Sequence, residues 1–418
     1  MKPTWRVITV LAALVVTVTA QASDELFDRV EDVLSWNTST GSVRGRVSGL
    51  VDLEGYAYGQ PAPGLIDAAE DTLFVPRLTV FLDVQVGPRI YAFVQARADR
   101  GFDPTRGETE PRMDEYAVRF TPWEDGRLSL QAGKFSTVVG NWIQRHSSWE
   151  NPFVSAPLTY ENLTGMWDNG PPGSAATLLA WSHVHPRTVS GAPATDKALR
   201  LPVVWGPAYA HGFSASGKLG RFTYAAELKN AALSARPRMW ESARFPQHHE
   251  TWGARVGFIP DARWNLGLSA STGSYLEPAA ARELSAGRTL GDYRQIVVAH
   301  DVSFAWRHLQ VWAEVFMTRF EIPGVGDADT LAYYVEVRRK FTPRFFGAVR
   351  WNESLYARFP HGMTGRNRWG ENVRRLDLAP VYRFTPHVQV KVQYSVEFHE
   401  VRSQAFSHWA AVQFTTRF

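Results

Sequence analysis

The chain has 418 residues, with 45 Lys and Arg against 41 Asp and Glu, and it contains no cysteine. The length allows two soluble domains or one large barrel, and the small net charge of +4 leaves no basic field that would indicate a nucleic-acid partner. After residue 22 no run of 18 apolar residues occurs, which excludes a protein that crosses a membrane with α-helices. Yet 16 Trp, 24 Phe and 14 Tyr make the chain rich in aromatic residues.

Residues 1–22 have the pattern of a secretory signal peptide. Lys2 and Arg6 form a basic start, an apolar run follows, and Ala20 and Ala22 supply small residues at the positions that a signal peptidase reads. The apolar run is short for a span of about 20 residues, and no basic stop follows it, so a membrane anchor is disfavoured. We expect export of the chain and removal of this segment, which lowers the net charge from +4 to +2.

Residues 23–40 are expected to form a periplasmic segment that contains a short amphipathic helix from Ser23 to Trp36. Ser23 can serve as the N-cap of this helix. The apolar side chains that share one helical stripe are Leu26, Phe27, Val30, Val33 and Leu34. Such a helix could lie in the periplasm, pack against the mouth of a lumen, or form only on docking.

Strict alternation of apolar and polar residues dominates residues 41–418. Between His387 and Phe398 the even positions are valine or aromatic and the odd positions are polar, which places the two sets on opposite faces of a strand. The pattern recurs in many segments. The connections between them alternate between tight turns, such as Gly87-Pro88, and long polar stretches, such as Leu276 to Leu290. This regularity is typical of membrane barrels and not of soluble sandwiches.

The last segment, Ala405 to Phe418, carries Val412, Phe414, Thr416 and Phe418 on one face. With this ending, the signal peptide and the alternation, the chain resembles the porin-type outer-membrane β-barrels of Gram-negative bacteria over residues 41–418. The resemblance implies an all-β, antiparallel transmembrane barrel with short periplasmic turns and long extracellular loops. It also implies an outer-membrane location, contact with lipid and lipopolysaccharide, and recognition of the strand ending in Phe418 by the barrel-insertion machinery. The resemblance also suggests a homotrimer, for which the sequence itself shows no interface.

An up-and-down order gives five strands before residue 138 and eleven from about residue 206, which makes 16 strands. If Ser174–Val184 and Leu199–Trp205 form an extra hairpin, the count is 18. We favour 16 strands, because both termini then lie on the periplasmic side and the region 138–205 becomes one very long connection.

The connection 138–205 is rich in aromatic residues, so it is expected to be folded rather than disordered. It follows the fifth strand, and in this position it resembles the third long loop that porins fold into the channel. The resemblance implies a constriction, and the residues that could line it are Gln144, Arg145, His146, Trp149 and Glu150. The alternative is a rigid extracellular cap whose aromatic side chains pack among themselves.

The phase of the strands places more basic than acidic side chains toward the lumen. The pore-lining candidates are Arg44, Arg46, Arg77, Arg97, Arg119, Arg255, Arg338, Arg350, Arg375, Arg383, Glu336 and Asp377. Arginine rings favour anions in pores, so the sequence predicts a channel for passive diffusion of small hydrophilic solutes with a weak preference for anions. The alternative is that these charges pair across neighbouring strands and brace the wall.

Enzymatic and metal-binding functions find little support. His300 and His408 are the only histidines on apolar phases, where a lipid hydrolase would need one, and they fall on the tenth and sixteenth strands, which are not neighbours. The clusters at 183–185 and 248–250 offer too few ligands for a metal. We therefore expect no catalytic residue, metal or cofactor. Three alternatives remain: a channel specific for sugars or anionic oligomers, an outer-membrane hydrolase that depends on His300 or His408, and a surface binding or structural barrel without conductance.

Overall fold

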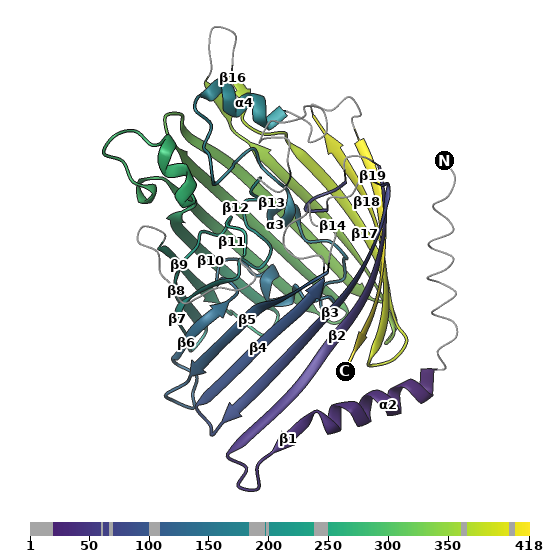
Figure 1. Cartoon of the computed structure of the whole chain (residues 1–418). Helices are drawn as coiled ribbons and strands as arrows, with labels where there is room; N and C mark the ends of the chain where they lie inside the picture. The colour runs from purple at the N-terminus through teal and green to yellow at the C-terminus, as the bar shows by residue number, and fades with distance from the viewer. Residues whose placement is uncertain are drawn as a thin grey trace.

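The computed structural model describes residues 20–59, 62–66, 70–99, 109–183, 197, 200–237, 250–360, 366–400 and 406–418. Within these ranges, 16 antiparallel strands form one barrel, and it closes where the last strand, β19, pairs with the first, β2 (Figure 1). The strands are β2 (Val43–Tyr58), β3 (Thr72–Val86), β4 (Ile90–Asp99), β5 (Glu110–Phe120), β6 (Ser129–Phe135), β7 (Ala210–Leu219), β8 (Phe222–Lys229), β9 (Thr251–Phe258), β10 (Trp264–Ser274), β11 (Arg294–Trp306), β12 (Leu309–Ile322), β13 (Gly326–Lys340), β14 (Phe345–Tyr356), β17 (Val373–Arg383), β18 (Val388–His399) and β19 (Phe406–Arg417).

The prediction of 16 strands is confirmed, with five before the long connection and eleven after it. The 18-strand alternative is wrong, because Ala175–His183 is a helix, α4, and not a strand. The segment is rich in Ala and Leu, which favour helix. The Ser174 hydroxyl also accepts a hydrogen bond from the amide of Thr177, 3.1 Å away, as an N-cap does.

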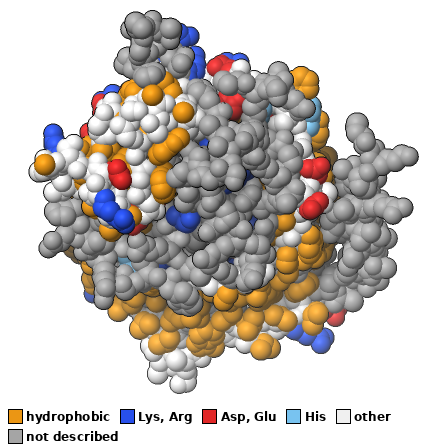
Figure 2. All heavy atoms as spheres, turned by 45° about the horizontal axis from the view of Figure 1, so that its top comes forward, with side chains coloured by type: hydrophobic (Ala, Val, Ile, Leu, Met, Phe, Trp, Pro, Cys, Tyr) orange, Lys and Arg blue, Asp and Glu red, His pale blue; other side chains and the backbone are white. Residues whose placement is uncertain are grey.

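The wall of the barrel is apolar outside and polar inside. On β18, Val392 and Tyr394 are 42% and 44% exposed, whereas the side chains between them and before them, Gln393 and Lys391, are buried in the interior. Figure 2 shows apolar side chains gathered on the outer wall below the mouth. This is the arrangement expected when lipid, and not water, surrounds a barrel.

The two ends of the barrel differ. One end, the short-turn end, carries tight connections such as 87–89, 220–221 and 307–308. The other end carries the long loops and two shorter connections, residues 323–325 between β12 and β13 and residues 400–405 between β18 and β19. Exposed tryptophans occur near both ends, among them Trp123 and Trp252, as in the aromatic belts of membrane proteins.

The N-terminal helix α2 (Ala20–Val33) lies at the short-turn end, outside the rim of the barrel (Figure 1). The Asp28 carboxylate is 3.1 Å from the His387 imidazole, which stacks on Phe27. The helix ends before Trp36, where it was expected to end, because Ser35–Asn37 form strand β1 and pair with β2. In the described part of the chain, no helix is long and apolar enough to cross a membrane. Most of the predicted signal peptide lies outside the described residues.

The loops at the long-loop end share one hydrophobic core. It contains Leu178 of α4, Trp205, Phe320 of β12 and Trp369, all at most 1% exposed. The short elements around it are the 3-10 helices η4 (Pro278–Glu283) and η5 (Leu290–Asp292) and the hairpin β15 (Arg358–Pro360) and β16 (Arg366–Arg368). This core fixes the part of the connection between β6 and β7 that lies at the long-loop end.

Candidate pore and the inner loop

Residues 136–209, the connection from β6 to β7, are called the inner loop here because their middle part lies inside the barrel. The loop contains the 3-10 helix η1 (Trp142–Arg145) and the one-turn helix α3 (Leu158–Glu161), which contacts β13 and β14. Figure 1 shows α3 within the outline of the barrel, whereas α4 lies at the long-loop end.

The start of the inner loop is fixed to β12 by one carboxylate. Glu314 accepts hydrogen bonds from the backbone amides of Asn141 and Trp142 and from the Tyr160 hydroxyl, the last two at 2.7 Å. Hydrogen bonds to a charged acceptor are stronger than neutral ones. Glu314 therefore joins two parts of the loop that lie far apart in sequence to the same point on the wall.

The middle of the loop is fixed to β14, β17 and β18. The Gln393 side-chain oxygen accepts hydrogen bonds from the amides of Val154 and Ser155, at 2.7 and 3.0 Å. Arg350 and Arg375 donate to the Ala156 carbonyl, at 3.1 and 2.5 Å. These bonds satisfy the backbone of an irregular segment that has no strand partner, so the wall holds the loop inside the lumen.

The turn at Ser148–Phe153 is held in the same way by a lysine. Lys391 of β18 donates to the carbonyls of Ser148 and Asn151, at 2.7 and 2.9 Å, and also to that of Phe153. The ammonium group of Lys391 thus donates its hydrogen bonds to backbone carbonyls of the loop instead of to water.

The loop covers several predicted pore-lining charges. Glu336, Arg350, Arg375 and Asp377 point into the barrel but are fully buried beneath the loop. Arg350 and Arg375 lie 2.9 and 3.0 Å from the Asp377 carboxylate. These residues form an ionic network between loop and wall, and they brace the wall rather than face open solvent.

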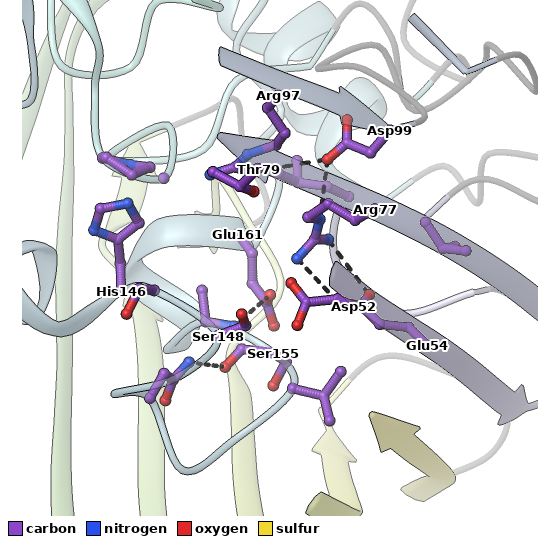
Figure 3. A pocket seen from close by; sticks show the side chains of 18 of the residues that line it. Asp52, Glu54, Arg77, Thr79, Arg97, Asp99, His146, Ser148, Ser155 and Glu161 are labelled. Carbon is purple, nitrogen blue, oxygen red and sulfur yellow. Dashed lines mark hydrogen bonds and ion pairs between the residues drawn. The ribbon is translucent and has the colours of Figure 1, made fainter. Parts of the chain in front are cut away.

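A cavity of about 360 Å³ remains between the inner loop and the opposite wall, β2 to β5. In Figure 3 the strands contribute Asp52, Glu54, Arg77, Thr79, Arg97 and Asp99, and the loop contributes His146, Ser148, Ser155 and Glu161. Arg77 bridges Glu54 and Asp99, at 2.9 and 3.0 Å. The cavity therefore carries charges of both signs on its strand side, among a lining that is otherwise largely apolar.

Two further charged residues, Arg112 and Asp114, extend this network. Arg97 and Arg112 each lie 2.9 Å from the Asp114 carboxylate. Asp114 is not among the predicted inward residues, because a β-bulge between Gln95 and Ala96 shifts the register of β4 against β5. Simple alternation cannot reveal such a shift.

His146 faces the cavity as a neutral side chain. Burial lowers the pKa of His146 to about 4, so the imidazole carries no charge at pH 7. It lies 2.8 Å from the Tyr209 hydroxyl. Glu161, the acidic loop residue beside it in the cavity, is paired with Arg375 at 2.5 Å. The loop side of the cavity is thus almost uncharged, in contrast to the strand side.

The other residues predicted for the constriction have different positions. Arg145 is paired with Glu336 at 2.5 Å, and its guanidinium lies over the Trp312 ring. Gln144 and Glu150 are exposed, and Trp149 is buried. Of the five candidates in the loop, His146 is the one that lines the cavity.

The remaining pore-lining candidates divide into two groups. Arg255 is buried and paired with Asp301 at 2.7 Å. Arg44, Arg46, Arg119, Arg338 and Arg383 lie toward the short-turn end and keep some exposure. Among these five, an ion pair is found for Arg46, whose partner is Glu31 of α2 at 3.2 Å.

The histidines considered for hydrolysis lie on separate strands. His300 on β11 and His408 on β19 are on the tenth and sixteenth strands. His300 lies 2.8 Å from the Gly267 carbonyl and His408 lies 2.7 Å from the Tyr394 hydroxyl. The described residues contain no group of three or more ligands that could hold a metal. His185, His248 and His249 lie outside the described residues.

Gly140 lets the loop turn into the lumen, and its replacement by alanine should loosen the loop. Its φ of +83° is unfavourable for other residues, and a Cβ there would lie 2.6 Å from the Tyr160 hydroxyl and 3.3 Å from the Glu314 carboxylate. We expect Gly140→Ala to weaken the Glu314 anchor and to increase the fluctuation of single-channel current while the barrel stays folded.

Gly126 supplies the matched control for this variant. It also has a positive φ, +69°, but nothing lies within 4 Å of an added Cβ. Gly126→Ala should cost only the backbone strain, about 1 kcal/mol, and leave the current as quiet as in the wild type. Equal noise in both variants would show that Gly140 does not control the loop.

Comparison with solved structures finds barrels of the same fold at low sequence identity. The chain is similar to OmpF of Salmonella typhi in complex with daunomycin, at 11% identity and a TM-score of 0.55, over 92% of this chain and 100% of that one. It is also similar to an anion-selective porin from Comamonas acidovorans (12%, TM-score 0.52, 90% and 100%) and to the outer-membrane channel DcaP of Acinetobacter baumannii (8%, 0.53, 92% and 99%). No family model matches the sequence, and no curated protein matches it.

Proposed function

We propose that this chain, which folds as a porin-type β-barrel, is an outer-membrane channel for passive diffusion of small hydrophilic solutes with a weak preference for anions. The observation that carries the proposal is the inner loop, which is bonded to one wall of the lumen and leaves a cavity with charged and aromatic lining against the other. The apolar outer wall and the signal-peptide pattern support the location. On this proposal the protein performs no catalysis.

The inner loop is the constriction of the proposed pore. A barrel of 16 strands is wide enough to enclose an aqueous channel, and the loop fills part of that space and borders a cavity of about 360 Å³. Cavities near the lower end of the range for small-molecule sites hold compact ligands. We therefore expect small sugars, amino acids and inorganic ions to pass and larger solutes to be excluded.

The proposed weak anion preference follows from the positions of arginines that have no carboxylate partner. On the strand side of the cavity, Arg77, Arg97 and Arg112 are matched by nearby carboxylates, so the constriction itself carries little net charge. Arg119 and Arg338, nearer the short-turn end, have glutamine partners instead. Positive charge without a matching carboxylate attracts anions from solution.

Single-channel recording of the refolded protein in a planar bilayer, with a salt gradient across it, tests the proposal. We expect stable open-channel current steps, and a reversal potential whose sign shows that chloride crosses more readily than the cation. A reversal potential of the opposite sign would refute the anion preference. A folded barrel that carries no current would refute the channel itself.

Removal of the constriction arginines should reverse the selectivity. Arg77→Gln with Arg97→Gln leaves Glu54, Asp99 and Asp114 with fewer counter-charges. We expect the reversal potential to change sign to that of a cation-selective pore. Arg127→Gln is the control, because Arg127 is exposed in a short turn and paired with Asp125. An unchanged potential in the double variant would place ion selection elsewhere.

A channel specific for sugars is the second candidate, and the aromatic lining of the cavity favours it. Trp142 and Trp205 of the inner loop and Tyr56 and Trp409 of the wall all line the cavity, and aromatic faces pack well on apolar solute surfaces. A neutral disaccharide that blocks the current at micromolar concentration would support this function. Block only at high millimolar concentration would favour general diffusion.

The partners proposed from the resemblance are lipid, lipopolysaccharide, the insertion machinery that recognises β19, and two sister subunits. Light scattering of the folded protein in detergent tests the assembly. A mass of three chains supports the homotrimer, and a mass of one chain refutes it.

A further inference from the structure

Three arginines at the short-turn end gather around two aromatic rings, Trp149 of the inner loop and Phe346 of β14. Arg383 of β17 and Arg417 of β19 hold their guanidinium carbons 4.9 and 4.4 Å from the centre of the Trp149 ring. Arg338 of β13 and Arg383 each lie 5.4 Å from the centre of the Phe346 ring. We call Arg338, Arg383 and Arg417 the arginine cluster. It joins three strands to the turn of the inner loop that lies nearest this end.

The hydrogen-bond partners of the cluster are neutral. Arg338 donates to the Gln310 side chain, Arg383 to the Gln389 side chain at 3.2 Å, and Arg417 to the Pro386 carbonyl at 2.7 Å. In the described part of the chain, none of the three has a carboxylate within ion-pairing distance. They differ in this from Arg350, Arg375 and Arg255 higher in the lumen, which are all ion-paired.

Two acidic side chains act electrostatically on the cluster. The exposed Glu150 acts on Arg338 and Arg383, and Glu336, which is paired with Arg145, acts on Arg338. Since Arg145 balances Glu336, three positive charges face the one negative charge of Glu150. Each arginine keeps partial exposure. An anion from solution can therefore reach the cluster, and its charge would relieve the repulsion between the guanidinium groups.

The aromatic rings make the cluster a preformed site. A guanidinium that stacks on an aromatic face keeps its edge N–H groups available, and it loses less freedom when it binds. The planar N–H edge matches the two oxygens of a carboxylate or phosphate group. Since Trp149 and Phe346 each contact two of the arginines, the site is fitted to a ligand that carries more than one anionic group.

We propose that the arginine cluster is a binding site for anions that carry two or more phosphate or carboxylate groups, at the short-turn mouth of the pore. The inference rests on the proposed function. It adds to that function a class of ligand and the end of the pore at which the ligand binds. The site lies below the inner loop, so an anion arriving from the short-turn side, the proposed periplasmic side, reaches it without passing the constriction.

Block of single-channel current by inorganic pyrophosphate tests the site, with citrate as the carboxylate probe. We expect pyrophosphate on the short-turn side to reduce the current at a concentration about tenfold lower than on the long-loop side. Arg338→Gln with Arg383→Gln should weaken this block about tenfold or more, since charge-assisted hydrogen bonds are lost. If citrate blocks and pyrophosphate does not, the class narrows to carboxylates, and the reverse result narrows it to phosphates.

Arg119 provides the matched control. It lies toward the same end but on the opposite wall, it donates to the Gln131 side chain, and it stands 5.7 Å from the centre of the Tyr91 ring. Arg119→Gln should leave the block by pyrophosphate within about twofold of the wild type. Equal weakening by Arg119→Gln would mean that general positive charge, and not the cluster, attracts the anion.

The orientation of each inserted channel must be known for this test. The chain has no cysteine, so Asp125→Cys in the exposed turn after β5 places a single thiol at the short-turn end. A bulky impermeant maleimide that alters the current from one side only identifies that side.

Two results separate failure of this inference from failure of the proposed function. If the channel conducts and neither anion blocks it better from the short-turn side, the site is refuted and the channel stands. If no current flows at all, calorimetric titration of pyrophosphate and citrate into the detergent-solubilised barrel decides the site by itself. Binding of either anion that Arg338→Gln with Arg383→Gln abolishes supports the cluster, and no binding overturns it.

Discussion

Replacement of residues 141–205 by a short Gly–Ser linker is expected to raise the single-channel conductance several-fold. The linker still joins β6 to β7, which are neighbours in the barrel, so closure of the wall does not depend on the loop. Buried groups such as Arg350, Asp377 and Lys391 then meet lumen water instead of the loop backbone. Water replaces the lost hydrogen bonds, and the barrel should retain its strand content in circular dichroism.

A smaller deletion gives the control. Removal of α4 alone, Ala175–His183, shortens the same loop at the long-loop end but leaves the anchors at Glu314, Gln393 and Arg375 in place. Its conductance should stay close to that of the wild type. A large increase in this variant, or none in the longer deletion, would show that the lumen part of the loop does not limit the current.

Asp377→Asn should destabilise the barrel more than any exposed charge change. Asp377 is fully buried and pairs with Arg350 and Arg375, at 2.9 and 3.0 Å, and it also accepts a hydrogen bond from the Ser395 hydroxyl. Loss of one partner from a buried ion pair leaves uncompensated charge and costs about 3–5 kcal/mol. Urea-induced unfolding of the protein in lipid vesicles measures the change in free energy.

The exposed pair Asp125–Arg127 offers the comparison. Its side chains are 52% and 54% exposed and 2.7 Å apart, and solvent screens such a pair. Asp125→Asn should change the free energy of unfolding by at most about 1 kcal/mol. If Asp377→Asn costs no more than Asp125→Asn, the network beneath the loop does not stabilise the barrel.

Most of the fold could be predicted from sequence patterns, because every strand of a membrane barrel repeats the same alternation of apolar and polar residues. On β18 every second residue from Val388 to Phe398 is apolar, and all of that set except the buried Val388 keep exposure on the outer face. Local signals of another kind defeated the rule at particular places. The good helix formers of Ala175–His183 form a helix where the 18-strand alternative required a strand, and the bulge beside Gln95 brought Asp114 into the interior.

The candidate site was harder to predict because its contacts are long-range. Strand phase placed Arg350 and Arg375 on the polar face of their strands, but nothing in the sequence shows that Ser155 and Ala156 would cover them. For the same reason the arginines cannot be sorted from sequence into those that pair, such as Arg255, and those that face only neutral partners, such as Arg338.

The anchors of the inner loop have a consequence for biogenesis. Trp142 and Val154 are bonded to residues that follow them by 172 and 239 positions, so the loop is synthesised long before its partners on β12 and β18. Contacts of such long sequence separation form late. On the proposed outer-membrane location, the exported chain carries an undocked loop until its strands pair, and the lumen becomes narrow only when the second half of the wall has assembled.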